Sequence, residues 1–165
     1  MTSIPSVPQV AALPCAGRTV VPQEYVDANG HMNIAPYMQI YNDHGWDYLG
    51  RFGLGPDDAL AGTAMIFDVE HHLRYLREVH VGDTLASRVR FIARTDKAVQ
   101  MMIYLVNETR DELAGTFESV SLHVAADTRR VAPFPKSIAE RLDAQVAADN
   151  AIDWMSTSKL SLTRG

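Results

Sequence analysis

The sequence predicts an α+β domain in which an antiparallel sheet curls around one helix. Residues 34–50 carry apolar side chains at three- and four-residue steps on more than one face, which indicates a helix enclosed by other structure. After a glycine-rich loop the period changes to two over residues 63–75, 84–95, 98–107 and 113–126. Short turns join these segments, so they predict antiparallel strands. A block of strands after a single helix favours α+β over a doubly wound fold.

Local signals define the ends of the other elements. Residues 18–21, RTVV, are rich in β-branched side chains and predict a first strand before the helix. Asn33 is a favourable N-cap, Pro36 suits the first turn, and Gly50 is placed to end the helix. Near the C-terminus, PFPKSIAERLDAQVAA predicts a proline-led amphipathic helix.

These elements predict one domain with two flanking segments. We expect residues 18–150 to form a single domain, because a chain of this length can bury a core. Residues 1–17 contain three prolines and no early basic region, so we expect a lead-in that is flexible or lies along the surface, and not a signal peptide. Residues 151–165 are polar and are expected to form a loosely held tail.

Composition excludes several classes of partner. The net charge of −5, from 20 acids against 15 bases, argues against nucleic acid. Cys15 is the only cysteine, so no internal disulfide can form and a cytoplasmic location is expected. No segment approaches the roughly 18 uninterrupted apolar residues of a membrane span, and we expect no membrane partner.

Polar residues crowd the entry to the helix in the sequence VDANGHMN, residues 26–33. A structural interpretation is available, because Asn-Gly favours a turn, Asp27 can accept backbone amides and Asn33 can cap the helix. It leaves His31 unexplained. The chemical alternative is that free amides at the helix N-terminus stabilise an oxyanion while the nearby carboxylate attacks a carbonyl or activates water. Thioesters suit this arrangement, because a thiolate leaves readily.

The run VDANGHMNIAPYM resembles the signature of hotdog-fold acyl-CoA thioesterases of the 4-hydroxybenzoyl-CoA thioesterase type. EHHLRYLREVHVGDTL, LAGTFESVSLHV and RRVAPFP extend the resemblance from about Val20 to Leu142. The matching motif positions are Asp27, Gly30, His31, Asn33 and Tyr37. The resemblance implies a hotdog fold, in which a curved antiparallel sheet wraps a long central helix. It also implies an acyl-CoA substrate, no separate cofactor, and a homodimer or homotetramer with active sites between subunits.

The resemblance also assigns roles within the motif. It makes Asp27 the catalytic carboxylate, as a nucleophile that forms an anhydride or as a general base, and these two mechanisms stay open. It gives His31 and Asn33 the task of shaping the loop and orienting Asp27 or water. The expected oxyanion donors are the backbone amides near Ile34 and Ala35.

Side chains elsewhere are candidates for contact with the acyl group. Tyr37 and Tyr41 follow the motif, although their rings also suit a core, and Gly30 shapes the loop. His71 lies in an apolar row, where a histidine is more often a hydrogen-bonded core residue than a catalyst. Glu118 lies on the more apolar face of its strand, so we expect it to pair with an arginine or to point into the acyl pocket.

Basic residues on one strand are candidates for binding coenzyme A. Arg88, Arg90 and Arg94 share one face of the 84–95 strand and could anchor its phosphates, unless that face is simply solvated. We predict no metal site, because the neighbouring side chains of the sequence EHH at 70–72 point in opposite directions along a strand.

The predicted activity is hydrolysis of a short or compact acyl-CoA. The GHMN motif and the LHV…RR ending also resemble thioesterases of carnitine and betaine breakdown, whose trimethylammonium acyl group would favour aromatic walls. A second family branch carries its acid on the central helix, where Asp43 could fill that part, but its polar neighbours favour a solvated or interface position. The alternatives are a non-catalytic acyl-CoA-binding module and a hydratase. Hydratases of this fold usually place Asp and His about five residues apart, whereas Asp27 and His31 are four apart.

Overall fold

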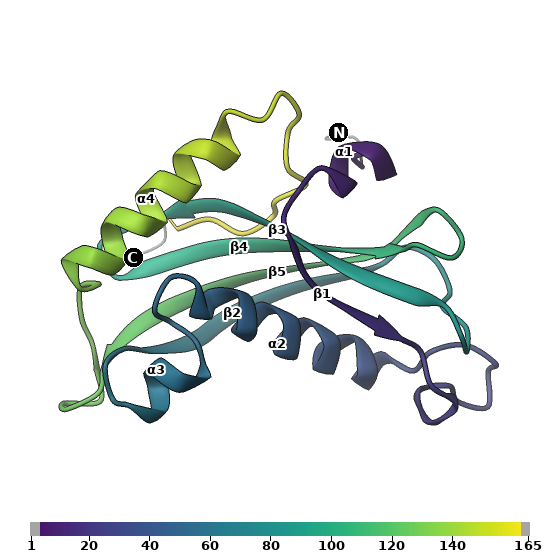
Figure 1. Ribbon diagram of the computed structural model, residues 1–165, viewed down its shortest axis with the longest axis horizontal. Helices are drawn as coiled ribbons and strands as arrows, with labels where there is room; N and C mark the ends of the chain where they lie inside the picture. The colour runs from purple at the N-terminus through teal and green to yellow at the C-terminus, as the bar shows by residue number, and fades with distance from the viewer. Residues whose placement is uncertain (1–3, 163–165) are drawn as a thin grey trace.

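The computed structural model describes residues 4–162, which form one curved antiparallel sheet with helices on both sides (Figure 1). The strand order is β1-β3-β4-β5-β2, and β6 pairs with β5. The strands are β1 Cys15–Val20, β2 Met65–Tyr75, β3 Thr84–Arg94, β4 Ala98–Asn107, β5 Glu112–Ala125 and β6 Arg130–Val131. The helices are α1 Val7–Ala11, α2 Ile34–Gly50, α3 Pro56–Leu60 and α4 Lys136–Asn150, with a 3-10 turn at Gln23–Tyr25. No helix within residues 4–162 has the length and apolar character needed to cross a bilayer.

The core lies between α2 and the inner face of the sheet. Tyr41 of α2 stacks on Phe117 of β5, with ring centroids 4.9 Å apart. Leu85, Val89 and Phe91 of β3 are each at most 1% exposed on the same face, as the alternation of β3 predicts. This arrangement confirms the predicted α+β hotdog fold, and α2 covers the residues predicted from its periodicity.

One flank of α2 remains open within the single chain. Ile34 and Trp46 are 67% and 39% exposed, and Phe67 and Val69 of the neighbouring edge strand β2 are 64% and 48% exposed. The helix is therefore not enclosed on every side, contrary to the sequence prediction. The apolar surface continues from α2 onto the β2 edge, which has no strand beside it within the described chain.

A β-bulge in β2 changes which of its side chains face inward. The register shifts between Asp68 and Glu70, where β2 pairs with β5. An extra residue in one strand reverses the alternation beyond it. As a result His71 faces the inner side together with Asp68, whereas the strict alternation placed these two residues on opposite faces.

The N-terminal segment packs on the sheet from residue 4 onward, so for residues 4–17 the flexible form of the lead-in is wrong and the alternative, a segment along the surface, agrees with the structure. Ser6 caps α1 in a reciprocal capping box with Gln9. Val10 and Leu13 are buried in a second apolar cluster on the outer face of the sheet, beside Tyr104. Residues 1–3 lie outside the described part of the chain.

The C-terminal segment 151–162 also packs on the outer face, so the predicted loose tail is wrong for these residues. Trp154 meets the Tyr104 ring edge-on at 5.6 Å and lies under the Arg90 guanidinium, 4.5 Å from its ring centroid. Ser158 is held by Glu118 and Gln100 of the sheet. Residues 163–165 of the predicted tail lie outside the described residues.

Glu118 anchors this segment, which corrects its assignment to the acyl pocket. Its carboxylate is fully buried on the outer face and accepts hydrogen bonds from Gln100 Nε2 at 2.7 Å and from the Lys159 amide at 2.8 Å. The Ser158 hydroxyl and the Leu160 amide donate to it as well. The partners of Glu118 are thus amides and a hydroxyl, and not the expected arginine.

We predict that Glu118→Gln loosens the C-terminal segment. The neutral amide turns an N–H toward main-chain donors, so the variant should lose about 1–3 kcal/mol of stability. Hydrogen exchange should accelerate at the Lys159 and Leu160 amides. The control is Glu112→Gln, at a partly exposed β5 position whose nearest cationic atom lies 3.8 Å away. Equal exchange rates in both variants would contradict the anchoring role.

Candidate active site

The loop before α2 is a tight turn closed by its own polar groups. The Asp27 amide donates to the His31 carbonyl at 3.2 Å, and the Gly30 amide donates to the Asp27 carbonyl at 3.0 Å. Gly30 adopts φ of 81°, which a residue with a side chain would adopt only under strain. The Asp27 carboxylate accepts from the Asn29 amide at 2.8 Å and from Asn33 Nδ2 at 2.9 Å. The turn therefore fixes both oxygens of the carboxylate.

These hydrogen bonds also set the charge of Asp27. The Asn29 amide and then the Asn33 side chain stabilise the charged form and lower the pKa of the carboxyl below its ordinary value of 3.8. The group is therefore ionised near neutral pH. An ionised carboxylate can act as a nucleophile or as a general base, whereas it has no proton to give as an acid.

The first turn of α2 offers one free amide and not the two expected. The Ala35 amide donates to Asn33 Oδ1 at 3.1 Å, so the N-cap already occupies it. The amide of Asn33 itself donates to the Tyr25 carbonyl at 2.8 Å, and Pro36 has no N–H. Among residues 4–162 no group accepts from the Ile34 amide, which sits at the positive end of the helix dipole. Of the two expected amides, the one at Ile34 is therefore free among the described residues, and Ala35 is corrected to a capped position.

Two hollows flank the start of α2, and Asp27 lines neither of them. The larger, of about 530 Å³, follows α2 along the inner side of β2, and the smaller, of about 380 Å³, lies beside the Asp27 loop. The walls of the larger hollow include Ala35, Tyr41, Trp46, Asp68, His71 and Phe117. The smaller is lined by residues that include His31, Ile34, Tyr37, Tyr75, Arg77 and Glu78. Largely apolar walls with a few polar groups are typical of small-molecule sites.

Most of the predicted substrate residues gather at these hollows. Tyr41 and His71 line the larger one, and Tyr37 lines the smaller one. His71 Nε2 lies 3.0 Å from the Asp68 carboxylate, and its ring is 4.7 Å from that of Phe117. The Tyr41 hydroxyl is buried without a hydrogen-bond partner among the described residues. Gly30 shapes the turn and lines neither hollow.

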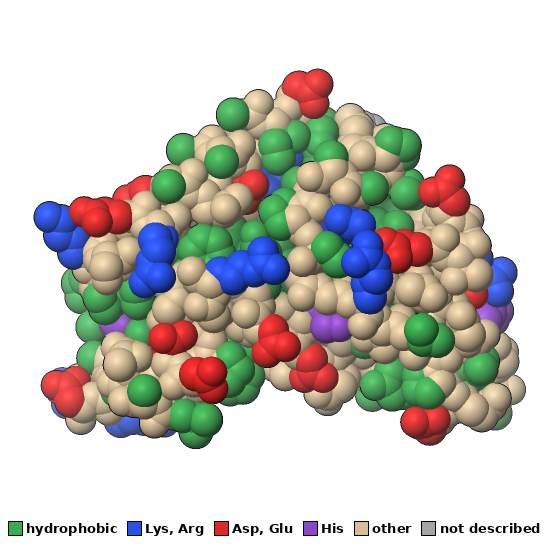
Figure 2. Space-filling view, in the orientation of Figure 1, with side chains coloured by type: hydrophobic (Ala, Val, Ile, Leu, Met, Phe, Trp, Pro, Cys, Tyr) green, Lys and Arg blue, Asp and Glu red, His purple; other side chains and the backbone are tan. Residues whose placement is uncertain are grey.

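The acid considered on the helix lies at the rim of the larger hollow and does not line it, although its two donors, Gln39 and Asn42, do. Asp43 is exposed and accepts hydrogen bonds from Gln39 at 2.8 Å and from Asn42 at 3.1 Å. Figure 2 shows acidic side chains over α2 on the face that it views. Asp43 therefore occupies the solvated position that its neighbours indicate.

Of the three arginines proposed for coenzyme A, Arg88 and Arg90 lie on the outer side of the sheet, whereas a bulge between Phe91 and Ala93 places Arg94 on the same face as Val99. Arg90 is 5% exposed and donates to the carbonyls of Asp149 and Trp154, so it is not available to a phosphate and that assignment is wrong. Arg88 donates to the Leu13 carbonyl at 3.1 Å. Arg94 forms an ion pair with a carboxylate of α4. All three arginines hold the flanking segments against the sheet.

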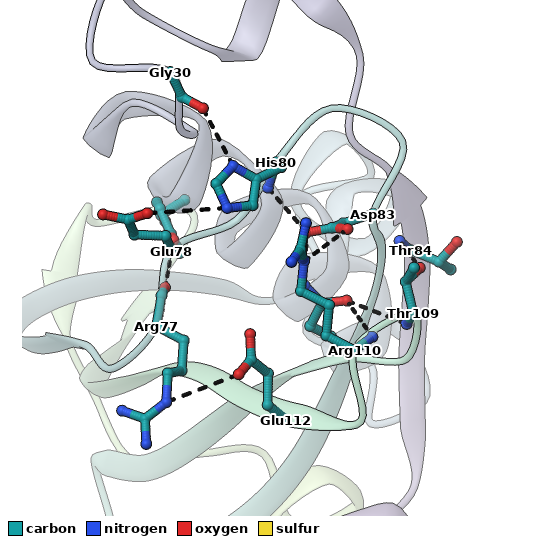
Figure 3. A network of polar contacts seen from close by, with 11 residues as sticks. Gly30, Arg77, Glu78, His80, Asp83, Thr84, Thr109, Arg110 and Glu112 are labelled. Atoms are coloured by element: carbon teal, nitrogen blue, oxygen red, sulfur yellow. Dashed lines mark hydrogen bonds and ion pairs between the residues drawn. The ribbon is translucent and has the colours of Figure 1, made fainter.

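The loop between β2 and β3 also contacts the candidate site, which the sequence did not predict. Its Val79 carbonyl accepts from the Met32 amide at 2.7 Å, and its Arg77 carbonyl accepts from the Tyr37 hydroxyl at 3.5 Å. His80 Nδ1 lies 3.2 Å from the Gly30 carbonyl (Figure 3). The only sequence signal was HVGD, which predicts a turn but not what the turn contacts.

Comparisons with known proteins agree on one superfamily. The Thioesterase-like superfamily matches residues 20–142. The chain is 33% identical over 119 residues to an L-carnitine dehydrogenase/betainyl-CoA thioesterase of Agrobacterium fabrum, covering 72% of this chain and 24% of that protein. It is 28% identical over 134 residues to a betainyl-CoA thioesterase of Pseudomonas aeruginosa, covering 81% and 84%. The chain thus spans about a quarter of the length of the first of these relatives.

A solved structure shows the same fold. A hypothetical protein from Staphylococcus aureus, determined in complex with CoA, superposes with a TM-score of 0.78 at 24% identity. The match covers 91% of this chain and 96% of that one. At this identity the likeness establishes the fold alone.

We predict that Asn33 controls the ionisation of Asp27. In the unmodified protein, NMR titration should give Asp27 a pKa below 3.8. Asn33→Ser keeps a side-chain acceptor for the helix cap but removes the amide donor, so the pKa should rise toward the ordinary value. An unchanged pKa in a folded Asn33→Ser variant would show that this hydrogen bond does not tune the carboxylate.

Proposed function

Since the chain belongs to the Thioesterase-like superfamily, which confirms the resemblance in its sequence, we propose that it hydrolyses the thioester bond of a compact acyl-CoA. The observation that carries the proposal is the bridge made by Asn33. Its amide nitrogen holds the Asp27 carboxylate while its amide oxygen caps α2. This bridge therefore holds the charged Asp27 carboxylate at the end of α2 where the Ile34 amide is free.

In the proposed mechanism the Ile34 amide donates to the thioester oxygen as it becomes an oxyanion. Asp27 either attacks the carbonyl carbon, expelling the CoA thiolate and leaving an anhydride that water cleaves, or removes a proton from an attacking water. Both routes consume one water and give a free acid and CoA. Asn33 orients the carboxylate, and His31 at the edge of the smaller hollow shapes the loop.

For the acyl group we propose a compact cationic or aromatic moiety in the larger hollow. Tyr41, Trp46 and Phe117 supply aromatic surface there, and Asp68 supplies a carboxylate. Aromatic faces attract quaternary ammonium groups, and a nearby anion adds to that attraction. The names of the two relatives, both betainyl-CoA thioesterases, support a trimethylammonium acyl group.

We further propose that the site is completed by a second copy of the chain. Ile34, Met38, Trp46, Phe67 and Val69 form an apolar strip that α2 shares with the edge of β2. Such a strip is unusual on a monomer that stays alone in water. Pairing of two β2 edges would cover it and would place a partner surface beside Ala35 and the larger hollow. The homotetramer expected from the resemblance stays a prediction.

We predict that Asp27→Asn lowers thiol release by at least about 100-fold, because the amide can neither attack the thioester nor accept a proton from water. Binding of acyl-CoA should change little, whereas the thermal unfolding midpoint should fall modestly, because the new amide can accept from only one of the two donors, the Asn29 amide and Asn33 Nδ2, that hold the carboxylate. The matched control is Asp43→Asn, an acid on the exposed side of α2, which should stay within about twofold of the parent in rate. A fully active Asp27→Asn protein would move the chemistry to another residue.

We predict that betainyl-CoA and other compact acyl-CoAs are turned over faster than long straight-chain esters. The walls of the larger hollow combine aromatic rings with the Asp68 carboxylate, which favours a compact cationic or aromatic acyl group over a long aliphatic chain. Free-thiol release should be measured as kcat/KM over betainyl-, benzoyl-, butyryl- and palmitoyl-CoA. Equal or faster turnover of palmitoyl-CoA would refute the compact pocket.

A further inference from the structure

The β2–β3 loop, residues 76–83, lies directly against the Asp27 loop and is called the support loop here. The two are joined at Met32, whose amide donates to the Val79 carbonyl at 2.7 Å, and at Gly30, whose carbonyl lies 3.2 Å from His80 Nδ1 (Figure 3). Of these two contacts, only the one between His80 and Gly30 is made by a side chain. It therefore depends on the residue type at position 80.

The support loop is itself held in place by a buried acid. Asp83 is 3% exposed and accepts from the His80 amide at 2.9 Å, from Asn107 Nδ2 at 2.8 Å and from Arg110 Nε at 2.9 Å. Burial alone would raise the pKa of this carboxyl, but these donors outweigh it and lower the pKa. The backbone of His80 is thus fixed to the sheet through β4 and the turn that follows it.

In the contact with Gly30, the donor atom of the His80 imidazole is Nδ1. A carbonyl oxygen can only accept, so Nδ1 carries the hydrogen toward Gly30 whether the ring is neutral or charged. Glu78 Oε2 lies 3.9 Å from the other ring nitrogen, Nε2, on the exposed side (Figure 3). Only the Nδ1 side of the ring touches the Asp27 loop.

The conformation of the Asp27 loop depends on the Gly30 peptide. Its φ of 81° makes it the one turn residue outside the ordinary backbone range, and its amide closes the turn on the Asp27 carbonyl. The preceding residue, Asn29, supplies the amide that binds the Asp27 carboxylate. A bond to the Gly30 carbonyl consequently restrains the same turn that aims the carboxylate.

We propose that His80 is a positioning residue for thioester hydrolysis, which holds the Gly30 carbonyl and through it the direction of the Asp27 carboxylate. The inference rests on the proposed function. His80 does not contact the substrate. A small displacement of a reacting group is enough to reduce the rate by one or two orders of magnitude, which is the size of effect expected from losing this bond.

Two substitutions of His80 distinguish the role of ring nitrogen Nδ1 from that of Nε2. His80→Asn places an amide N–H where Nδ1 lies, and His80→Gln places it near Nε2. We expect His80→Gln to lower kcat about 10- to 100-fold with KM within about twofold, because the carboxylate acts mainly in the transition state. His80→Asn should retain kcat within about threefold. His72→Gln, on β2 and outside both hollows, is the control and should behave as the parent.

Hydrogen exchange gives a second readout, which does not depend on thioester hydrolysis. Hydrogen exchange of the Gly30 and Asn29 amides should accelerate in His80→Gln and stay near the parent rate in His80→Asn, with equal unfolding midpoints for both variants. Parent-like kcat and exchange in His80→Gln would overturn the proposal, and so would equal losses in the two variants. If the parent releases no thiol from any acyl-CoA, the proposed function fails, and the exchange rates still decide whether His80 restrains the turn.

Discussion

The side-chain amide of Asn33 makes two hydrogen bonds on which the rest of the site depends. Its oxygen accepts from the Ala35 amide and starts α2, and its nitrogen donates to Asp27. The start of the helix and the direction of the carboxylate are therefore set by one planar group. The structural and chemical interpretations of the crowded motif are not alternatives in this arrangement. The N-cap leaves the Ile34 amide free, and it brings a charged acid to the same end of the helix.

The sheet contributes the walls and leaves one side open. Its curvature encloses most of α2, but β2 is an edge strand whose bulge turns Asp68 and His71 toward the helix. On the outer side, α1 and residues 151–162 cover the sheet, and buried polar groups such as Glu118 and Arg90 hold the C-terminal segment, whereas α4 packs Ile138 and Leu142 into the core on the α2 side. The polar interactions of the outer face thus serve stability, while residues of the uncovered apolar strip line the two hollows on the inner side.

Periodicity predicted the parts of the fold that repeat. Residues 34–50 and the four long strands were found within one or two residues, because burial of one face leaves a regular pattern in the sequence. Irregular segments left no such pattern. Val10 and Trp154 are held by neighbours far away in the chain, so their segments seemed loose from composition. Alternation along a strand showed which face Arg90 and Glu118 lie on, but not which segments cover that face. Both residues were therefore assigned to ligands. The motif at Asp27 was found from its spacing, whereas the contact from His80 depends on the path of a loop.

The central claim is that a thioester carbonyl sits between the Asp27 carboxylate and the Ile34 amide. It is tested most directly by a crystal structure with an acyl-CoA analogue in which a methylene group replaces the thioester sulfur. The account predicts the ketone oxygen within hydrogen-bond distance of the Ile34 amide and a carboxylate oxygen of Asp27 close to the carbonyl carbon or to a water beside it. A ketone bound on the outer face of the sheet, or in the larger hollow with no contact to either group, would contradict it.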